Sequence, residues 1–464
     1  MESNLRMFEP YHLSRRTRIA IMLTLVASFF VISPVLILYT AGYRYTVETH
    51  TISTTGVLSI DVEPDDAAVY INDELVEKNL PLIQRATRLL QGKSVREKAV
   101  LPLRLTDLTP GVYRIHIQKD GYKSWTKDVT IESNKTAYIK NIELFLESVP
   151  IQTYETKAQA AFSPSGKYVV LLNENTASLS TVADPTTSLF TSQEGELPQR
   201  ILWSPYAEFF VLESTINTIP HIILVSAGTP ESAHQYRLTD VPTHIQWISE
   251  SIPSIVVQQG PLLERMTLVG RAPLDTTSTS VWYVQNNETI WYFDTIAQTL
   301  QQEGKTINTP LHVKRNIDAI IDSNNERIIA HSLDSLLSIS TNDKEGNNIK
   351  QVPATSLFYN AATKEWIAWS PWELWTLYPH GGADLRNRTS EAIQFVRPLD
   401  SEGVLLIATE KKLLAFNPNP LYYTTHELFS GSSLIEEVSV DIDKRIISML
   451  TTIDGSRGIY ALPY

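Results

Sequence analysis

The sequence AFSPSGKYVV at residues 161–170 decides the fold, because variants of it recur along the rest of the chain. Two apolar segments flank Ser-Pro-Ser-Gly, a combination that favours a tight turn between two strands. The sequence LWSPYA at residues 202–207 begins the same unit again. Further strand–turn–strand units begin near residues 245, 281, 319, 357, 393 and 438, so consecutive starts are 36 to 45 residues apart. This spacing predicts a repeat of roughly forty residues with irregular loops.

Repeats of this length with four short strands are typical of β-propeller blades. One blade cannot bury both of its faces, so neighbouring blades must stack, and Trp and Tyr side chains fit the wedge-shaped space between them. The two Ser-Pro turns are also similar to the W-S-P-D-G-K hairpins of TolB-like and related propellers. We therefore expect a mainly β chain in which residues 151–464 form a β-propeller of about eight blades, with seven as the alternative.

Acidic residues are concentrated in this repeat region. The 464 residues carry 39 Lys and Arg against 51 Asp and Glu, a net charge of −12. Residues 146–464 hold 21 basic and 35 acidic side chains, whereas residues 56–145 hold 13 of each. The acidic balance argues against nucleic-acid binding. The absence of cysteine excludes disulfides, thiolate nucleophiles, iron–sulfur clusters and cysteine-type zinc sites.

The N-terminal region predicts a membrane anchor. Residues 19–41 form a stretch of 23 residues without a charge, long enough for a helix to cross a bilayer. Arg15, Arg16 and Arg18 precede it, so the positive-inside rule places residues 1–18 in the cytoplasm. The linker at 42–55 and everything after it would then lie outside the cytoplasm. A cleaved signal peptide is the alternative, but its apolar region is shorter and ends in a small-x-small site.

A smaller β domain is expected between the anchor and the repeats, at residues 56–146. Residues 57–62 alternate apolar and polar side chains, as a half-buried strand does. Turn signals and further apolar runs follow at residues 64–71, 109–117 and 119–144. The pattern predicts a compact β-sandwich.

The order of these signals resembles the PEGA domain, a small surface-associated β module of bacteria and archaea. The resemblance implies a structural role for the residues that match its motifs, which are Pro64, Asp65, Asp66 and Ala67 in place of Pro-Glu-Gly-Ala, then Pro110, Gly111 and Tyr113, and finally Gly121 and Tyr122. Asp66 departs from the family's glycine, so a different turn geometry is expected there.

Residues 78–98 replace a short link of the PEGA pattern. They carry six basic side chains, including Arg85, Arg88, Lys93 and Arg96, against a single acidic one. Apolar residues recur there at helical spacing, which predicts a short amphipathic helix. Its basic side is a candidate surface for anionic lipid headgroups or acidic wall polymers. The alternative, which we favour, is a solvated helix whose apolar side packs on the sheet.

Four tryptophans, Trp366, Trp369, Trp372 and Trp375, lie within ten residues. Strand alternation would point some of them outward, where indoles stack on sugars or peptides, so Trp372 and Trp375 form a second candidate surface. Packing between blades is the alternative that we favour.

Motifs for chemistry were sought and not found in the sequence. It contains no serine elbow, no His-Glu-x-x-His, no phosphate-binding loop and no dinucleotide fingerprint, and its 10 His are dispersed. Residues 322–326, DSNNE, could chelate calcium, but a hairpin turn is favoured. We therefore predict no catalytic residue, no metal site and no cofactor.

The whole arrangement resembles single-pass PEGA-domain membrane proteins, a resemblance that implies an architecture and no activity. We expect a non-catalytic binding or scaffold protein of the cell envelope, held in the bilayer by residues 19–41. Its partner would be an envelope protein or polysaccharide. The alternative is a propeller-based hydrolase or lyase acting on an envelope polymer, which would need carboxylates or histidines at one end of the central channel. A Tol-like periplasmic partner is a third hypothesis, which the direct anchor disfavours.

Overall fold

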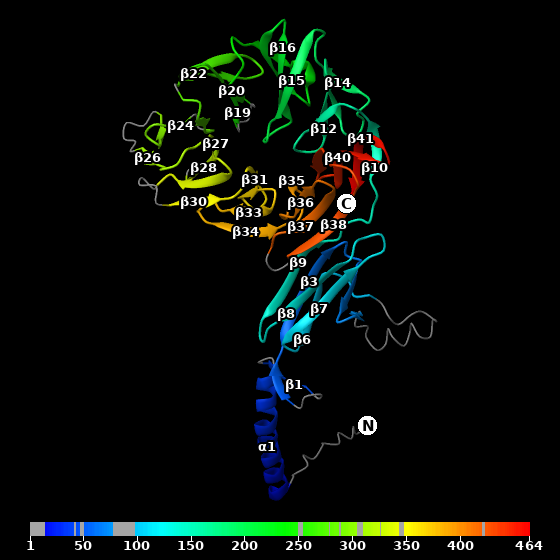
Figure 1. The fold of residues 1–464 in the computed structure, drawn as a ribbon. Coiled ribbons are helices and arrows are strands. Elements are labelled where there is room, and N and C mark those ends of the chain that lie inside the picture. Colours follow the sequence, from blue (N-terminus) through cyan, green and yellow to red (C-terminus); the bar gives the residue numbers. More distant parts are fainter. Residues whose placement is uncertain are drawn as a thin grey trace, which may run out of the picture. The chain divides into compact units, whose positions relative to one another are not determined.

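The computed structural model of the chain describes residues 14–40, 43–46, 51–77, 98–248, 254–277, 279–286, 289–303, 310–324, 326–342, 348–419 and 423–464. The fold is mainly β, with one long apolar helix near the N-terminus (Figure 1). The chain divides into two compact units, Met1–Leu144 and Phe145–Tyr464. The expected mainly β fold class and apolar N-terminal helix are therefore confirmed.

Helix α1 spans Arg15–Thr40 and contains Pro34. Ser14 caps its first turn, because the Ser14 Oγ accepts the Thr17 backbone N–H at 3.2 Å. None of its side chains is buried, so its apolar surface faces outward on every side. At 1.5 Å per residue the helix is about 39 Å long, which exceeds the roughly 30 Å hydrocarbon core of a bilayer. By length and composition α1 can cross a membrane.

Among the described residues of the first unit, the structure shows a hairpin and two sheets. The hairpin pairs β1 (Tyr43–Thr46) with β2 (Thr51–Thr54). A three-stranded sheet has the order β6-β3-β9, and a four-stranded sheet has the order β5-β4-β7-β8. The strand bounds are β3 Gly56–Glu63, β4 Ala68–Ile71, β5 Glu74–Leu75, β6 Leu103–Leu108, β7 Gly111–Gln118, β8 Trp125–Ile131 and β9 Thr136–Glu143.

Both sheets of this unit contribute to one hydrophobic core. Strand β8 packs against β3 and β9 of the other sheet. Leu58 and Ile60 of β3 and Ile115 of β7 are fully buried, and Trp125 of β8 is 2% exposed. The alternation along residues 57–62 thus orients their apolar side chains toward the interior, as the sequence pattern predicted.

In the second unit, the structure describes eight four-stranded antiparallel sheets. We number them in chain order, and each strand pairs with the next in seven of them. The bounds for the first four sheets are β11 Gln159–Phe162, β12 Tyr168–Leu172, β13 Ala177–Thr181 and β14 Ser188–Thr191; β15 Glu196–Trp203, β16 Phe209–Ile216, β17 Ile219–Ser226 and β18 His234–Arg237; β19 His244–Ile248, β20 Ser254–Gln259, β21 Leu262–Met266 and β22 Arg271–Thr276; and β23 Trp282–Val284, β24 Ile290–Asp294, β25 Thr299–Gln302 and β26 Leu311–His312. A short 3-10 helix, η1 (Pro230–Ser232), precedes β18.

The remaining sheets complete the unit. Their strands are β27 Ala319–Ser323, β28 Arg327–Ser332, β29 Ser335–Ser340 and β30 Ile349–Val352; β31 Ser356–Asn360, β32 Glu365–Trp369, β33 Glu373–Leu377 and β34 Ala383–Arg388; β35 Ile393–Pro398, β36 Leu405–Thr409, β37 Lys412–Asn417 and β38 Thr424–Ser430; and, in the eighth sheet, β10 Ile151–Glu155 with β39 Glu437–Asp441, β40 Ile446–Ile453 and β41 Ser456–Pro463. The eight strand starts expected from the sequence fall in or next to β11, β15, β19, β23, β27, β31, β35 and β39.

The eighth sheet is composite, because it joins strands from the two ends of the unit. Strand β10 pairs antiparallel with β41, and the order of the sheet is β10-β41-β40-β39. Strand β39, at the other edge, packs beside β11 of the first sheet and β35 of the seventh. Residues at the start of the unit therefore complete a sheet formed by residues at its end.

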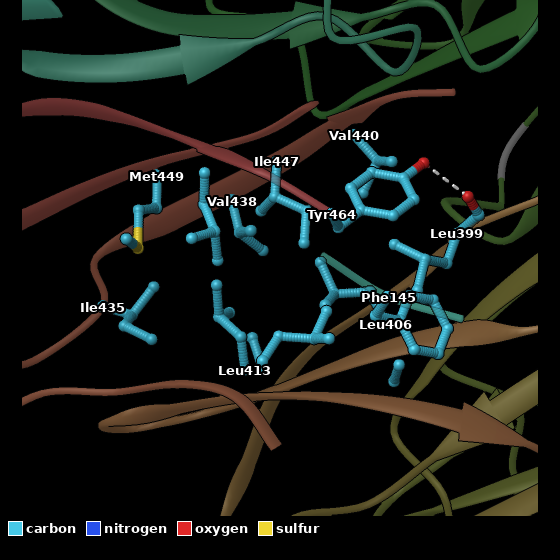
Figure 2. Close-up of a cluster of buried hydrophobic side chains, with 14 of the residues drawn as sticks. Phe145, Leu399, Leu406, Leu413, Ile435, Val438, Val440, Ile447, Met449 and Tyr464 are labelled. Carbon is cyan, nitrogen blue, oxygen red and sulfur yellow. Dashed lines mark hydrogen bonds between the residues drawn. The ribbon is translucent and has the colours of Figure 1, made fainter. Parts of the chain in front are cut away.

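Each sheet shares a buried apolar cluster with the next one in the chain. An eighth cluster joins the eighth sheet to the first, through Leu450 and Ile459 on one side and Phe162 and Val169 on the other. Figure 2 shows the cluster between the seventh and eighth sheets, where the Tyr464 hydroxyl donates to the Leu399 carbonyl at 2.7 Å. Both faces of the sheets are thus used for packing, which follows from strands that are apolar on both sides.

Candidate binding site

The structure describes one of the two candidate surfaces predicted from the sequence, the tryptophan surface, and does not describe the basic one. Arg85, Arg88, Lys93 and Arg96 lie in 78–97, outside the described residues, so this surface stays a prediction. Trp372 lies in the turn between β32 and β33 and is 54% exposed. Trp375 of β33 is half-buried against the cluster between the fifth and sixth sheets, and its indole N–H donates to Glu373 at 3.0 Å.

The other two tryptophans of this group pack inside the unit. Trp369 is 7% exposed and meets Phe358 edge to face at 6.1 Å. Trp366 is 1% exposed. Core packing, the favoured interpretation, applies to these two residues.

In the first unit, the PEGA-like turns are joined by a lysine that the sequence analysis did not identify. The Pro64–Ala67 turn closes through the Ala67 N–H and Pro64 carbonyl at 3.1 Å. Lys119 donates to Asp66 at 2.5 Å and lies 5.1 Å from the centre of the Tyr122 ring. The hydrogen bond with Lys119 lowers the pKa of Asp66.

Backbone conformation explains where this motif needs glycine. Gly121 has a φ of +79°, in the left-handed region that favours glycine. The φ of Asp66 lies outside that region, so aspartate replaces the family's glycine there without backbone strain, and its carboxylate gains Lys119 as a partner. The turn that contains Pro110 and Gly111 leads directly into β7, which begins at Gly111.

Tyr113 fixes this last turn. Its hydroxyl donates to the Thr109 carbonyl at 2.8 Å, four residues upstream, and lies 2.9 Å from the Thr109 hydroxyl. A tyrosine that bonds back to the backbone in this way holds the entry to a strand in a β-sandwich. The Pro-Gly-x-Tyr pattern is therefore a structural lock.

We expect Tyr113→Phe to lower the free energy of unfolding of the first unit by about 1 kcal/mol, because it removes the hydroxyl and retains the ring. This change is measured by urea unfolding, with hydrogen exchange in peptides from residues 103–131 as the signal that reports on the first unit. Tyr138→Phe is the matched control, since Tyr138 is 51% exposed and its ring lies near Lys140. Equal effects of the two substitutions would contradict the lock.

In the second unit, Asp322 connects three sheets. Its carboxylate accepts the Trp366 indole N–H at 2.6 Å and the Tyr283 hydroxyl at 3.2 Å. These partners belong to the sixth and fourth sheets, whereas Asp322 lies on β27 of the fifth. The Ser323 backbone N–H is a third donor, at 2.7 Å. Burial and then Asp322 raise the pKa of Tyr283, so Tyr283 remains a hydroxyl donor.

Tyr206, in the turn between β15 and β16, extends this network to the second sheet. Tyr206 is 50% exposed, and burial followed by the charge of Asp322 raises the pKa of Tyr206 to about 12. The network thus brings together residues of sheets two, four, five and six.

Other charged side chains of the sheets form ion pairs. Arg397 lies 3.7 Å from Glu437, and burial raises the pKa of Glu437 while Arg397 opposes the shift. Arg200 lies 3.5 Å from Glu213, and burial raises the pKa of Glu213 while Arg200 again opposes the shift. Burial, with a smaller contribution from Arg200, lowers the pKa of His244, so its imidazole is neutral at pH 7.

A pocket of about 670 Å³ lies beside the loop between the third and fourth sheets. Its walls come from the end of β22, the loop that follows it, the turn after β24 and the end of β25. At one side the Tyr292 hydroxyl donates to Asp275, and it lies 3.4 Å from Glu303. These residues are 11 to 28 positions apart in sequence, and no spacing motif connects them.

The two carboxyl groups beside the Tyr292 hydroxyl, Asp275 and Glu303, differ in proton affinity. Burial, and then hydrogen bonding and repulsion from Asp275, raise the pKa of Glu303. The pKa of Asp275 is lowered by hydrogen bonds from Tyr292, the Thr276 backbone and Glu303, which outweigh the opposing effect of burial. Hydrogen bonding and repulsion between the two carboxyls thus separate their pKa values.

This pair predicts a pH dependence of stability. A carboxyl whose pKa is raised by folding binds its proton more tightly in the folded state. For Glu303, the free energy of unfolding therefore falls as the pH rises from 4.5, the ordinary pKa of glutamate, through the raised pKa. For Asp275, whose pKa is lowered by folding, the free energy of unfolding falls instead as the pH drops below 3.8, the ordinary pKa of aspartate. We expect Glu303→Gln to make the decline above pH 4.5 shallower, as measured by thermal unfolding between pH 4.5 and 7, while buried carboxyls such as Glu437 retain their own contribution. Glu174→Gln, in an exposed turn, should keep the wild-type profile; the same decline in Glu303→Gln would contradict the assignment.

Comparisons with known proteins support part of this description. Residues 101–144 match the PEGA domain family, which covers Pro110, Gly111, Tyr113, Gly121 and Tyr122. Among solved structures, Hsv2p of Kluyveromyces lactis is similar at 10% identity with a TM-score of 0.37, over 58% of this chain and 96% of that chain. A eukaryotic initiation factor is similar at 10% identity with a TM-score of 0.46, over 69% of this chain and 93% of that one. No curated protein matches the chain significantly.

Proposed function

We propose that the protein is a single-pass, membrane-anchored binding or scaffold protein of the cell envelope, with its N-terminus in the cytoplasm. Helix α1 is the anchor, the PEGA-like β-sandwich follows it, and the eight sheets of the second unit are the blades of a β-propeller. Recognition of an envelope polysaccharide or protein takes place on the propeller.

The observation that carries this proposal is the cyclic sequence of apolar clusters in the second unit. Each sheet packs against the next, the eighth packs against the first through the Leu450 and Ile459 cluster, and β10 completes the eighth sheet. Packing of this kind favours a rigid ring of blades closed by pairing of the two ends. A rigid body on a membrane anchor suits binding, because little conformational entropy is lost when a ligand docks.

Pairing of buried carboxyl groups supports a non-catalytic role. Glu437 lies 3.7 Å from Arg397, and Asp322 accepts three hydrogen bonds. A general acid or base needs a site where its proton can move to a substrate, and these groups are committed to neighbours instead.

A hydrolase or lyase acting on an envelope polymer is the second candidate function. It is favoured by Asp275 and Glu303, whose pKa values shift in opposite directions, as in an acid and base pair. Incubation of the full chain with envelope polysaccharide, followed by assay of new reducing ends, tests it. Turnover that disappears in Glu303→Gln would replace the binding proposal by this one.

Orientation is testable because the natural chain contains no cysteine. We expect a membrane-impermeant maleimide to label Glu174→Cys in intact cells, or in spheroplasts where an outer barrier exists. Ser3→Cys should be labelled only after lysis. The reverse pattern would overturn the proposed topology.

Recognition by the propeller is tested by retention of envelope fractions on the immobilised full chain, on a variant lacking residues 56–144 and on a variant lacking residues 145–464. The first deletion keeps Phe145, which packs in the buried cluster between the seventh and eighth sheets. We expect the same polysaccharide or protein component to remain bound to the full chain and to the first variant, and to be lost from the second. Binding that disappears with residues 56–144 would assign recognition to the PEGA-like domain instead.

A further inference from the structure

We propose that the pocket between the third and fourth sheets binds an uncharged, polyhydroxylated ligand, such as a segment of a neutral glycan. This inference rests on the proposed binding function and specifies its site and ligand class. We call this site the hydroxyl pocket, defined by Asp275, Thr276, Ser280, Tyr292, Thr295 and Glu303 together with Gln301.

The hydroxyl pocket is large enough for two sugar rings and has a polar lining. Its volume is about 670 Å³, within the usual range for ligand sites. Thr276, Ser280 and Thr295 are exposed at its wall, and each hydroxyl can both donate and accept. Gln301 adds an amide whose N–H lies 3.4 Å from the Thr299 hydroxyl, at the weak limit of a hydrogen bond, so it can turn to a better partner.

The composition of the walls excludes anionic ligands. Of the described residues that line the pocket, none is Lys, Arg or His, whereas Asp275, Asp294 and Glu303 are acidic. A phosphate or carboxylate would therefore face acidic side chains and find no cationic partner among these residues. A purely apolar ligand would leave the carboxyl, amide and hydroxyl groups without water or partners, which costs about 1–3 kcal/mol for each buried group.

Metal ions fit the pocket poorly. Within the described ranges, no group of three His, Cys, Asp or Glu side chains is arranged to hold a metal. Asp294 is already engaged, because its Oδ1 accepts the Ile296 and Ala297 backbone N–H groups, both at 2.9 Å. Asp275 and Glu303 both lie within hydrogen-bond distance of the Tyr292 hydroxyl, so their carboxyl oxygens are also engaged.

A glycan satisfies the groups that remain. Sugar hydroxyls donate to carboxyl oxygens and accept from amide N–H groups, and Asp275, Glu303 and Gln301 provide both kinds of partner. Ile296 lies at the same wall and is 96% exposed, so it offers an apolar contact for the C–H face of a sugar ring. The mixture of hydrogen-bonding groups with one apolar contact is typical of a site that orients its ligand.

The test uses the full chain in phosphatidylcholine nanodiscs, because sugar-based detergents would compete for the pocket. An array of neutral oligosaccharides is screened first, and the best binder is titrated calorimetrically. Spermidine and CaCl2 are titrated in parallel. We expect a neutral oligosaccharide to bind, and Gln301→Ala and Thr295→Val each to weaken its affinity about fivefold to tenfold, since each removes one hydrogen bond. Gln235→Ala, on the outer strand β18 of the second sheet, should leave the affinity unchanged.

Three outcomes would overturn the inference. Binding of spermidine or Ca²⁺ in place of any neutral oligosaccharide would show a cation site. Absence of binding to every neutral oligosaccharide would exclude a glycan pocket. Binding that is insensitive to both pocket variants would place the glycan elsewhere on the chain. In that last case the proposed binding function is not contradicted. The retention experiment on envelope fractions tests that function independently of the pocket.

Discussion

Replacing Asp322 by alanine is expected to lower the free energy of unfolding of the second unit by about 3 kcal/mol, because two donors lose their acceptor inside the protein. Trp366 is 1% exposed and Tyr283 is 6% exposed, so water cannot readily replace the carboxylate. Each unsatisfied buried group costs about 1–3 kcal/mol. The loss of stability is measured by thermal and urea unfolding of the full chain, monitored by tryptophan fluorescence.

A matched substitution at an exposed aspartate shows how much stability is lost when any aspartate that accepts a tyrosine hydroxyl is replaced by alanine. Asp384 also accepts a tyrosine hydroxyl, from Tyr378 at 2.7 Å, but its side chain is 57% exposed. We therefore expect Asp384→Ala to change stability by less than about 1 kcal/mol, since water replaces the carboxylate. Equal losses for Asp322→Ala and Asp384→Ala would show that the Asp322 network contributes nothing specific.

Removing Ser456–Tyr464, which contains β41, is expected to abolish cooperative unfolding of the second unit. The deletion leaves β10 without its partner in the eighth sheet and removes one of the two partners of β40. It also removes Ile459 and Leu462, which are 0% and 1% exposed and belong to clusters on opposite sides of that sheet. Burial of each such side chain contributes about 1.5–3 kcal/mol, so the sum approaches the whole stability of a domain. Differential scanning calorimetry of the full and shortened chains tests this result.

A milder change at the same place provides the control. Tyr464→Phe retains the ring that packs in the cluster of Figure 2 and removes only the hydroxyl bond to Leu399. We expect a loss of about 1 kcal/mol with cooperativity intact. If the shortened chain also unfolds in one sharp transition near the wild-type temperature, pairing of β10 with β41 is not needed to hold the sheets together.

Periodic and compositional features were predictable from the sequence. Uncharged residues 19–41 lie almost entirely within α1, because length and apolarity alone determine a helix in this setting. The strand starts at 161 and 202 fall in β11 and at the end of β15, because Ser-Pro turns and alternating apolar residues act locally. The composite eighth sheet was not predicted, since β10 at residues 151–155 carries no signal that it pairs with the far end of the unit.

The residues of the candidate sites could not be predicted, because their contacts are long-range. Residues 322–326 were expected to form a hairpin turn, and Asp322 indeed lies at the end of β27 near such a turn. A register shift between Ile320 and Asp322 in β27 marks a bulge, which re-aims the side chains that follow it. The partner Trp366 is 44 residues away. Lys119 was missed for a similar reason, as its partner Asp66 is 53 residues away.

The composite eighth sheet can form only late in the synthesis of the chain. Tyr154 of β10 pairs with Ile459 of β41, so this contact must wait until about 300 further residues have been made. At 5–20 residues per second, synthesis of that length takes roughly 15–60 s. During this interval the eighth sheet and its clusters with the first and seventh sheets are incomplete, and a contact of such long range is slow to form. The emerging unit therefore needs protection from aggregation until its last strand arrives, which predicts a dependence on chaperones during biogenesis.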